Sequence, residues 1–326
     1  MSASARNIPV HKSPLVVEPT GSHKTTMIVL HGRGSTAERF AEPFLASLVS
    51  EAAASNVAER ANAVFQDYFP NTKFVYPTAP LRRAVAFNRS LTHQWFDKWS
   101  PQHPELKQHL QVPGLRETST YLHGLIQQEI DIIGAPHVAL VGLSQGCASS
   151  LIATLLWRGE PFGAVVGMCG YLPFRASMVD VVDEADDEDN PFAETKGDAN
   201  GVTERETEES ETNTKSEKAI AWLHTELEMD KEDVHIEPPP IQSIPIFMGH
   251  GTEDPLIPCE HGRQAVEFLR AIDADIEWNE YEGLDHWYSA DMLRDIIDFI
   301  KRRTGWESTT LTKSGDIIGV EDQRES

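Results

Sequence analysis

Short apolar runs alternate with longer segments of helical spacing along most of the 326-residue chain. Most of the runs are continuous and rich in Val, Ile and Leu, which is typical of strands covered on both faces. The longer segments place apolar residues at intervals of three and four, as a helix with one buried face does. This alternation predicts an α/β fold with a mainly parallel, doubly wound sheet and helices on both faces. The predicted strands cover residues 26–30, 73–76, 137–141, 163–168, 245–248 and 275–281, and the predicted helices cover 36–65, 117–133, 147–156, 260–272 and 289–303.

Residues 183–240 interrupt this alternation. Residues 180–233 hold 20 acidic and only 5 basic side chains, so most of the net charge of −23 lies in this part of the chain. A segment so rich in charge and so poor in apolar residues buries too little surface to fold alone, and we expect a largely disordered insertion. Within it, residues 218–228 have the spacing of a short helix with Trp222 on the apolar side. A solvated surface insertion and a mobile lid over an active site are both compatible with this segment.

The remainder of the chain is predicted to form one domain, built from residues 25–182 and 241–306. Residues 1–24 are predicted to be a flexible N-terminal arm, and residues 307–326 a flexible C-terminal tail. At this length, one domain can bury a substantial core.

Composition excludes several classes of protein and location. The three cysteines are widely spaced and form no Cys-x-x-Cys pair, which argues against a disulfide framework or a zinc site and fits a reducing compartment. Residues 1–20 contain no apolar stretch of signal-peptide length, and no run is long enough to cross a membrane. No basic patch points to nucleic acid. We therefore expect a cytoplasmic protein with no stable membrane insertion and no nucleic-acid partner.

The most specific chemical motif is the sequence GLSQG at residues 142–146, which lies between a predicted strand and a predicted helix. Gly-x-Ser-x-Gly in a strand–turn–helix setting is the nucleophile elbow of an α/β-hydrolase. The tight turn leaves no room for side chains at its two flanking positions, so both are glycine. The central serine then projects above the sheet, next to the N-terminus of the helix. We therefore predict that Ser144 is a nucleophile and that the fold is that of an α/β-hydrolase.

A serine hydroxyl is a poor nucleophile unless a base removes its proton as it attacks. In this fold the partners follow the serine in the order acid, then histidine. His286 lies in a loop after the last predicted strand, from which an imidazole can reach Ser144, whereas His261 lies at the start of a predicted helix. We predict that His286 is the base.

The acid is expected at the carboxyl end of the preceding predicted strand, where Asp254 is followed by Pro255. Its role would be to hold the tautomer of the imidazole and to stabilise the imidazolium. Glu253 and Asp285 are weaker candidates, since Asp285 is adjacent to the histidine in sequence and is poorly placed to face it. We predict that Asp254 is the acid.

The transition state of acyl transfer also needs donors for a developing oxyanion. One donor is expected to be the backbone N–H of Gln145, the residue after the nucleophile. The other is expected in the glycine-containing loop after the first predicted strand, with the N–H of Arg33 as the candidate. A glycine turn that merely caps the strand is the alternative for this loop. The chemistry needs no metal and no organic cofactor.

Seven motifs in order make the chain resemble the phospholipase/carboxylesterase family, which includes acyl-protein thioesterases. They are LHGRG at 30–34, PTAP at 77–80, WFD at 95–97, GLSQG at 142–146, GYLP at 170–173, HGTEDP at 250–255 and GLDH at 283–286. The resemblance implies that Ser144, Asp254 and His286 form the catalytic triad, and that Arg33 and Gln145 line the oxyanion hole. It also implies a substrate groove bordered by residues 87–99, with substrate contacts from Trp95, Phe96 and Leu172.

The resemblance implies a serine carboxylesterase or thioesterase that works through an acyl-enzyme, with acyl esters or thioesters, including S-acylated proteins, as substrates. The chain departs from the usual thioesterase pattern at residues 33–35 and at Cys147, so a protein substrate and a small ester both stay open. A monomer or a weak homodimer is expected. The alternatives are an α/β-hydrolase peptidase, for which no propeller or large cap is evident, and a non-catalytic binding protein that uses the acidic insertion to contact a partner.

Overall fold

The computed structural model describes residues 11–50, 63–100, 102–188, 214–229 and 238–306. A seven-stranded sheet forms the centre of the molecule, with strand order β1-β3-β2-β6-β7-β8-β9. All neighbouring strands are parallel except β1, which pairs with β3 in the antiparallel direction. The strands of this sheet are β1 (Leu15–Val17), β2 (Thr25–Leu30), β3 (Thr72–Tyr76), β6 (Val138–Leu143), β7 (Ala164–Met168), β8 (Ile246–Gly251) and β9 (Ile276–Tyr281).

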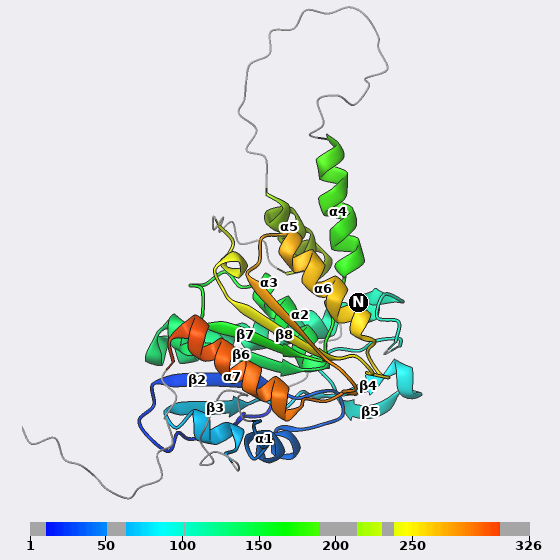
Figure 1. Ribbon diagram of the computed structural model, residues 1–326. Coiled ribbons are helices and arrows are strands. Elements are labelled where there is room, and N and C mark those ends of the chain that lie inside the picture. Colours follow the sequence, from blue (N-terminus) through cyan, green and yellow to red (C-terminus); the bar gives the residue numbers. More distant parts are fainter. Residues whose placement is uncertain (1–10, 51–62, 101, 189–213, 230–237, 307–326) are drawn as a thin grey trace, which may run out of the picture.

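Helices cover both faces of the sheet (Figure 1). One face packs against α1 (Ala37–Leu45) and α7 (Ala290–Thr304). The opposite face packs against α2 (Val112–Ile133), α3 (Gln145–Leu155), α4 (Arg175–Glu188), α5 (Lys215–Glu226) and α6 (Cys259–Ala271). Short 3₁₀ turns complete the elements: η1 (Phe65–Tyr68), η2 (Val85–Phe87), η3 (Gln108–Leu110), η4 (Ala135–His137) and η5 (Pro240–Gln242). Among the described helices, none combines the length and the apolar character needed to cross a bilayer.

Strand β2 shows why the apolar runs that predict the strands have no polar residue at every second position. Ile28 and Leu30 lie in the core on one face of the sheet, while Met27 and Val29 lie in the core on the other face. All four side chains are fully buried. Because successive side chains of a strand point to opposite faces, a sheet covered on both sides demands apolar residues at every position. The predicted α/β class, with a mainly parallel sheet between helices, is confirmed.

Strand β1 lies within residues 1–24, which were predicted to be a flexible arm. In the structure Leu15 pairs with Tyr76 and Val17 pairs with Phe74 at the edge of the sheet. Three residues are too few for a period to be visible, and their partner strand is distant in the sequence, so the pattern of the chain does not reveal this pairing. Residues 1–10 of the predicted arm and all of the predicted tail, 307–326, lie outside the described residues.

Helix α5 is an ordered part of the insertion predicted at 183–240, of which residues 189–213 and 230–237 lie outside the described residues. Ala219, Leu223 and Leu227 are fully buried in the main core. Trp222 packs edge-on against Phe174, with ring centroids 6.0 Å apart. The helix also has a capping box at its N-terminus and begins the segment that returns the chain to β8. Composition alone does not reveal that residues 215–226 form a helix. Packing of one apolar face of this helix against the core is enough to stabilise it.

The helix predicted over residues 36–65 is shorter in the structure, where α1 ends at Leu45. The chain then forms an isolated antiparallel bridge between Leu48 and Val64. Residues 51–62 lie outside the described part of the chain. An Ala-rich composition favours a helix locally, but it does not decide where tertiary contacts end one.

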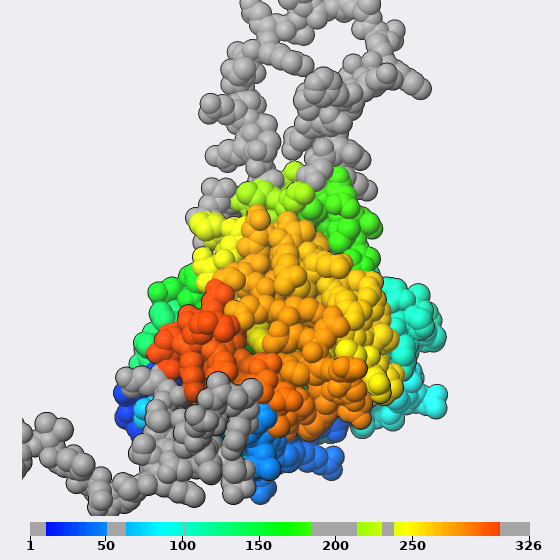
Figure 2. Space-filling model, in the orientation of Figure 1, coloured from blue at the N-terminus to red at the C-terminus, as the bar shows by residue number. Residues whose placement is uncertain are grey.

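A two-stranded hairpin, formed by β4 (Leu81–Ala84) and β5 (Ser90–His93), was not predicted. Figure 1 shows it beside the carboxyl ends of the central strands. On the molecular surface its cyan residues lie near the yellow and orange C-terminal part of the chain (Figure 2). The backbone N–H of Gly34 donates to the carbonyl of His93 at 2.7 Å, so the hairpin is tied to the loop after β2.

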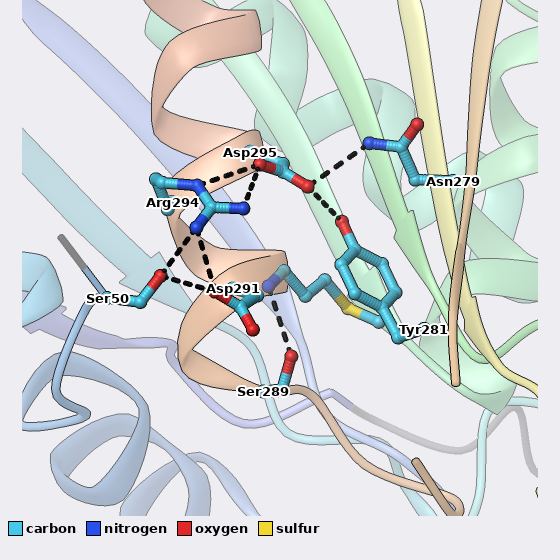
Figure 3. A network of polar contacts seen from close by, with 8 residues as sticks. Ser50, Asn279, Tyr281, Ser289, Asp291, Arg294 and Asp295 are labelled. Atoms are coloured by element: carbon cyan, nitrogen blue, oxygen red, sulfur yellow. Dashed lines mark hydrogen bonds and ion pairs between the residues drawn. The ribbon is translucent and has the colours of Figure 1, made fainter. Parts of the chain in front are cut away.

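A polar network fixes α7 relative to β9 and the segment after α1 (Figure 3). Arg294 donates to Asp291 at 2.8 Å, to Asp295 at 2.9 Å and to Ser50 at 2.9 Å. The hydroxyl of Tyr281, at the end of β9, donates to Asp295 at 2.9 Å. The loop between β9 and α7 is therefore held at both ends, and this loop carries His286.

Candidate active site

Ser144 occupies the turn between β6 and α3 and has the strained backbone angles of a nucleophile elbow, with φ of 59° and ψ of −116°. The two positions that flank the serine must be glycine, because a side chain at either would clash with neighbouring backbone atoms. A Cβ on Gly142 would lie 2.4 Å from the backbone of Gly146, and a Cβ on Gly146 would lie 2.5 Å from the carbonyl oxygen of Leu30. A positive φ at a serine is unfavourable, so the surrounding structure must enforce it. The turn presents Ser144 at the carboxyl edge of the sheet.

A continuous chain of hydrogen bonds joins the three residues predicted to act together. The Oγ of Ser144 lies 2.8 Å from Nε2 of His286, and Nδ1 of His286 lies 2.6 Å from Oδ2 of Asp254. A carboxylate only accepts hydrogen bonds, so Nδ1 carries a proton, and in the neutral ring Nε2 is an acceptor for the serine hydroxyl. The arrangement matches the roles of nucleophile, base and orienting acid.

Asp254 is held by more partners than the sequence indicated. Its Oδ1 accepts from the backbone N–H groups of Leu256 and Ile257, both at 2.9 Å. Its Oδ2 lies 3.2 Å from Nε2 of His250, a fully buried histidine on β8. Burial raises the pKa of the Asp254 carboxyl, but the hydrogen bonds from His250, His286 and Ile257 outweigh it and hold the pKa well below its usual range. Asp254 is therefore ionised at neutral pH.

The loop of His286 is attached to the end of β8, where Asp254 lies. The N–H of Glu253 donates to the carbonyl of Leu284 at 3.1 Å, and the N–H of Thr252 donates to the carbonyl of Tyr281 at 3.0 Å. These bonds join the two loops that carry Asp254 and His286, which explains how residues 32 positions apart meet at 2.6 Å.

The loop after β2 is held in place by a buried histidine. His31 accepts a hydrogen bond at Nε2 from the N–H of Ala79 at 3.1 Å, so its Nδ1–H donates to the carbonyl of Gly32 at 2.7 Å. Burial lowers the pKa of His31 to about 4, which keeps the ring neutral. The indole of Trp95 donates to the carbonyl of His31 at 2.8 Å. Among the described residues, no acceptor takes the backbone N–H of Arg33 or of Gln145, so both amides are available to a ligand.

The side chain of Gln145 connects the elbow to the residues predicted to contact substrate. Its Oε1 accepts from the N–H of Trp95 at 2.9 Å, and its Nε2 donates to the carbonyl of Phe96 at 2.7 Å. Trp95 and Phe96 are fully buried and do not line the cavity at Ser144. Leu172 lines a neighbouring cavity of about 220 Å³. The structure thus brings Trp95 and Phe96 to the elbow as core residues, while Leu172 lies at a second hollow.

A cavity of about 190 Å³ opens at Ser144 and His286. One part of its wall is apolar and is made by Phe40, Leu143, Leu256, Ile257 and Trp287. Another part carries the cationic side chains of Arg33 and Lys98. The Trp222 helix, α5, does not line it.

Lys98 was not singled out by the sequence, although it directly follows the WFD motif. The residue is only 4% exposed, and its ammonium lies over the ring of Tyr171 at 5.2 Å. Burial, with a contribution from the charge of Arg33, lowers the pKa of Lys98 to about 7. The guanidinium of Arg33 stacks on Phe87, 3.8 Å from its ring centre.

A mainly parallel sheet of this order, with helices on both faces, defines an α/β-hydrolase fold. Solved structures agree: the chain is similar to carboxylesterase SOBER1 of Arabidopsis thaliana, with a TM-score of 0.57 and 22% identity over 86% of this chain and 98% of that one. It is similar to acyl-protein thioesterase 2 of Zea mays, with a TM-score of 0.56 and 18% identity over 90% of this chain and 99% of that one.

The phospholipase/carboxylesterase family model matches residues 11–200 and 219–304, and the chain belongs to this family. Acyl-protein thioesterase 1 of Gibberella zeae is 25% identical over 89% of this chain and 95% of its own. Carboxylesterase SOBER1 of Arabidopsis thaliana is 25% identical over 74% of this chain and 81% of its own. The resemblance seen in the seven motifs is confirmed, and the family and relatives support a hydrolase of the α/β-hydrolase family.

Proposed function

We propose that the protein is a serine hydrolase that cleaves acyl esters or thioesters through an acyl-enzyme intermediate. The observation that carries this proposal is the unbroken chain from Ser144 through His286 to Asp254, with contacts of 2.8 and 2.6 Å, at the mouth of a cavity. A strained backbone at the serine, a histidine partner and a buried carboxylate are together typical of a catalytic serine and not of an ordinary surface serine.

In the proposed reaction Ser144 Oγ attacks the acyl carbon while His286 Nε2 takes its proton. Asp254, ionised and fixed by its own hydrogen bonds, stabilises the imidazolium without taking the proton. The backbone N–H groups of Arg33 and Gln145 stabilise the oxyanion. His286 then returns the proton to the departing alcohol or thiol. Water, activated by the same histidine, attacks the acyl-enzyme, releases the acid and restores Ser144.

Relatives named acyl-protein thioesterase and carboxylesterase support both thioesters and esters as the substrate class. The cavity of about 190 Å³ is smaller than the roughly 300–1,000 Å³ of sites that enclose a drug-sized ligand. It therefore encloses the reacting group and only a short part of any long acyl chain. Substrate contacts from Trp95, Phe96 and Leu172, a cytoplasmic location and a monomeric or weakly dimeric state stay predictions from the sequence.

The test is hydrolysis of matched p-nitrophenyl esters and S-acyl peptide thioesters, with acyl chains from two to sixteen carbons, and with Ser144→Ala as the control. Hydrolysis that Ser144→Ala loses supports the proposal, and a preference for one series assigns the leaving group. A well-folded wild-type protein that hydrolyses neither series, or a Ser144→Ala variant that retains turnover, contradicts it.

A further inference from the structure

Two basic side chains line the cavity at Ser144 without a carboxylate of the described residues in direct contact with either. Arg33 and Lys98 both line it, and within the described residues neither side chain forms an ion pair or a hydrogen bond. Their recorded contacts are with aromatic rings, Phe87 for Arg33 and Tyr171 for Lys98. Lys98 is buried and Arg33 is half-buried, and charges in such places are normally paired, so the pair leaves room for an anionic ligand.

The acidic groups nearby are already engaged. Asp97 attracts Arg33 electrostatically and raises its pKa but forms no ion pair with it, and its Oδ1 accepts from the N–H of Val85 at 3.0 Å and from the N–H of Lys98 at 2.9 Å. Asp254 is occupied by His286 and the backbone. The hydroxyl of Tyr171 is buried, and burial raises its pKa far above neutrality, so it supplies no charge. No acidic side chain of the described residues lines the cavity beside Arg33 and Lys98, so an anion bound there meets two basic groups on this part of the wall.

We propose that Arg33 and Lys98 form a subsite for an anionic group, a carboxylate or a phosphate, carried by the substrate next to the acyl bond that Ser144 cleaves. The proposal rests on the proposed function and deepens it, since it names the chemical class of the substrate. Both cations and the nucleophile line one cavity of about 190 Å³, so an anion bound there lies within a few bonds of the reacting carbonyl.

The two side chains suit this task in different ways. A guanidinium stacked on a ring presents a planar set of donors that matches carboxylate or phosphate oxygens. An ammonium is a compact charge with three donors, and at 4% exposure it meets its ligand with little competing water. Charge attraction is stronger in such a place than at an open surface. An arriving anion would also restore the charged form of Lys98, whose pKa burial and Arg33 lower to about 7.

The alternative is that Lys98 is a packing residue, with its stem buried and its ammonium resting on Tyr171. A packing role predicts that replacing Lys98 changes the hydrolysis of all esters equally. An anion subsite predicts that the change depends on the charge of the substrate.

The experiment measures kcat/KM on pairs of esters that differ in charge and little in shape. Mono-p-nitrophenyl succinate and p-nitrophenyl 4-methylpentanoate place a carboxylate or an isopropyl group at the same point of the acyl chain. 4-Acetoxybenzoate and 4-acetoxyphenyl phosphate, each against phenyl acetate, place the anion in the leaving group and separate carboxylate from phosphate. The protein is the full chain, as wild type, Lys98→Met, Lys98→Gln and Arg33→Met. Lys107→Met, which removes an exposed charge that lies over Trp99, is the matched control.

We expect the ratio of anionic to neutral kcat/KM, for at least one pair, to fall about tenfold or more in Lys98→Met, Lys98→Gln and Arg33→Met. Lys107→Met should keep the wild-type ratio. Folded Lys98 and Arg33 variants with the wild-type ratio for every pair would overturn the subsite while leaving the proposed hydrolase function intact.

Absence of turnover in the wild type would instead overturn the proposed function, and the subsite is then tested by binding alone. Isothermal titration with phenylphosphonate and benzoate, against neutral benzamide, needs no catalysis. Binding of either anion that is weakened at least tenfold in Lys98→Met supports the subsite. No anion binding by the folded wild type contradicts it.

Discussion

The two sides of the Ser144 cavity differ in how their charges are balanced. On one side Asp254, His286 and Ser144 form a chain in which every acceptor and donor has a partner. On the other side the side chains of Arg33 and Lys98 lie over aromatic rings, and among the described residues neither forms an ion pair or a hydrogen bond. The first side is complete without a ligand, as a preorganised catalytic group should be. The second is incomplete, and it is there that the chain can choose among substrates.

The two sides also differ in origin: the side with Ser144, Asp254 and His286 is a feature of the fold, whereas Lys98 is a feature of this particular sequence. The elbow, the strand-end loops and the histidine loop follow from an α/β-hydrolase architecture. A lysine after the WFD motif follows from no rule of that architecture, and its burial is unfavourable for folding. We interpret Lys98 as a residue that serves binding, and substitutions on both sides of the cavity test this interpretation.

The largest effect is expected from Ser144→Ala. Removal of the nucleophile should lower kcat/KM for a p-nitrophenyl ester by about 10⁴-fold or more, because the residual oxyanion donors and binding alone give little catalysis. Steady-state kinetics measure the loss, and circular dichroism checks the fold. Ser149→Ala, at a buried serine of α3, is the control and should stay active.

Asp254→Asn should lower kcat by about 10³- to 10⁴-fold, since an amide no longer fixes the tautomer of His286. The same substitution replaces one carboxylate oxygen by an amide nitrogen, so the side chain loses either the acceptor that faces His286 and His250 or the acceptor of the two backbone N–H groups. Kinetics and thermal unfolding, measured together, separate the catalytic loss from instability. A folded Asp254→Asn variant with activity near wild type would show that the acid lies elsewhere, and Glu253→Gln and Asp285→Asn would then be compared.

Lys98→Met should stabilise the protein at low pH. A lowering of the Lys98 pKa from 10.5 to about 7 means that the fold favours the neutral amine, and the cost of charging it is at most about 5 kcal/mol. That cost is fully present below pH 7 and fades as the pH rises towards 10.5. Urea unfolding at pH 6 and pH 9 measures this difference. The free energy of unfolding of Lys98→Met should exceed that of the wild type by about 2–4 kcal/mol at pH 6 and by less at pH 9. An advantage that does not change with pH would mean that Lys98 is not perturbed.

The smallest effect is expected in the pH dependence of substrate preference. The ratio of anionic to neutral kcat/KM should be highest below pH 7 and fall up to about tenfold by pH 8.5, as Lys98 loses its charge. The other groups facing this space are Arg33, Tyr171, Asp97 and His286. Arg33 stays charged and Tyr171 stays neutral over this range, and His286 acts on both substrates alike. Lys98→Met should make the ratio flat. A slope that survives in Lys98→Met would assign the titration to another group.

The elements that position the site could be predicted because each one is locally determined. Strand β6 and the first half of β8 are continuous apolar runs, and the elbow requires its glycines through contacts within a few residues and with β2. Asp254 and His286 follow the ends of strands, where an α/β sheet collects its functional groups. Strand order and loop position therefore bring them to Ser144, although the residues are far apart in the sequence.

The features that were not predicted depend on contacts between distant segments. Strand β1 exists only through its pairing with β3, and α5 folds only against an existing core. Lys98 gives no periodic signal, since its burial arises where the 94–99 loop meets Tyr171 and Arg33. His250 was visible only as part of a motif, and its approach to Asp254 becomes apparent only in three dimensions.

The central claim, that Ser144 is an activated nucleophile, is tested most directly by labelling with a fluorophosphonate. Intact-mass spectrometry counts the adducts, and peptide mapping locates them. We expect one adduct, on Ser144, that His286→Ala reduces strongly and Ser144→Ala abolishes. A folded wild-type protein that gains no adduct, or that carries the adduct on another residue, would contradict it.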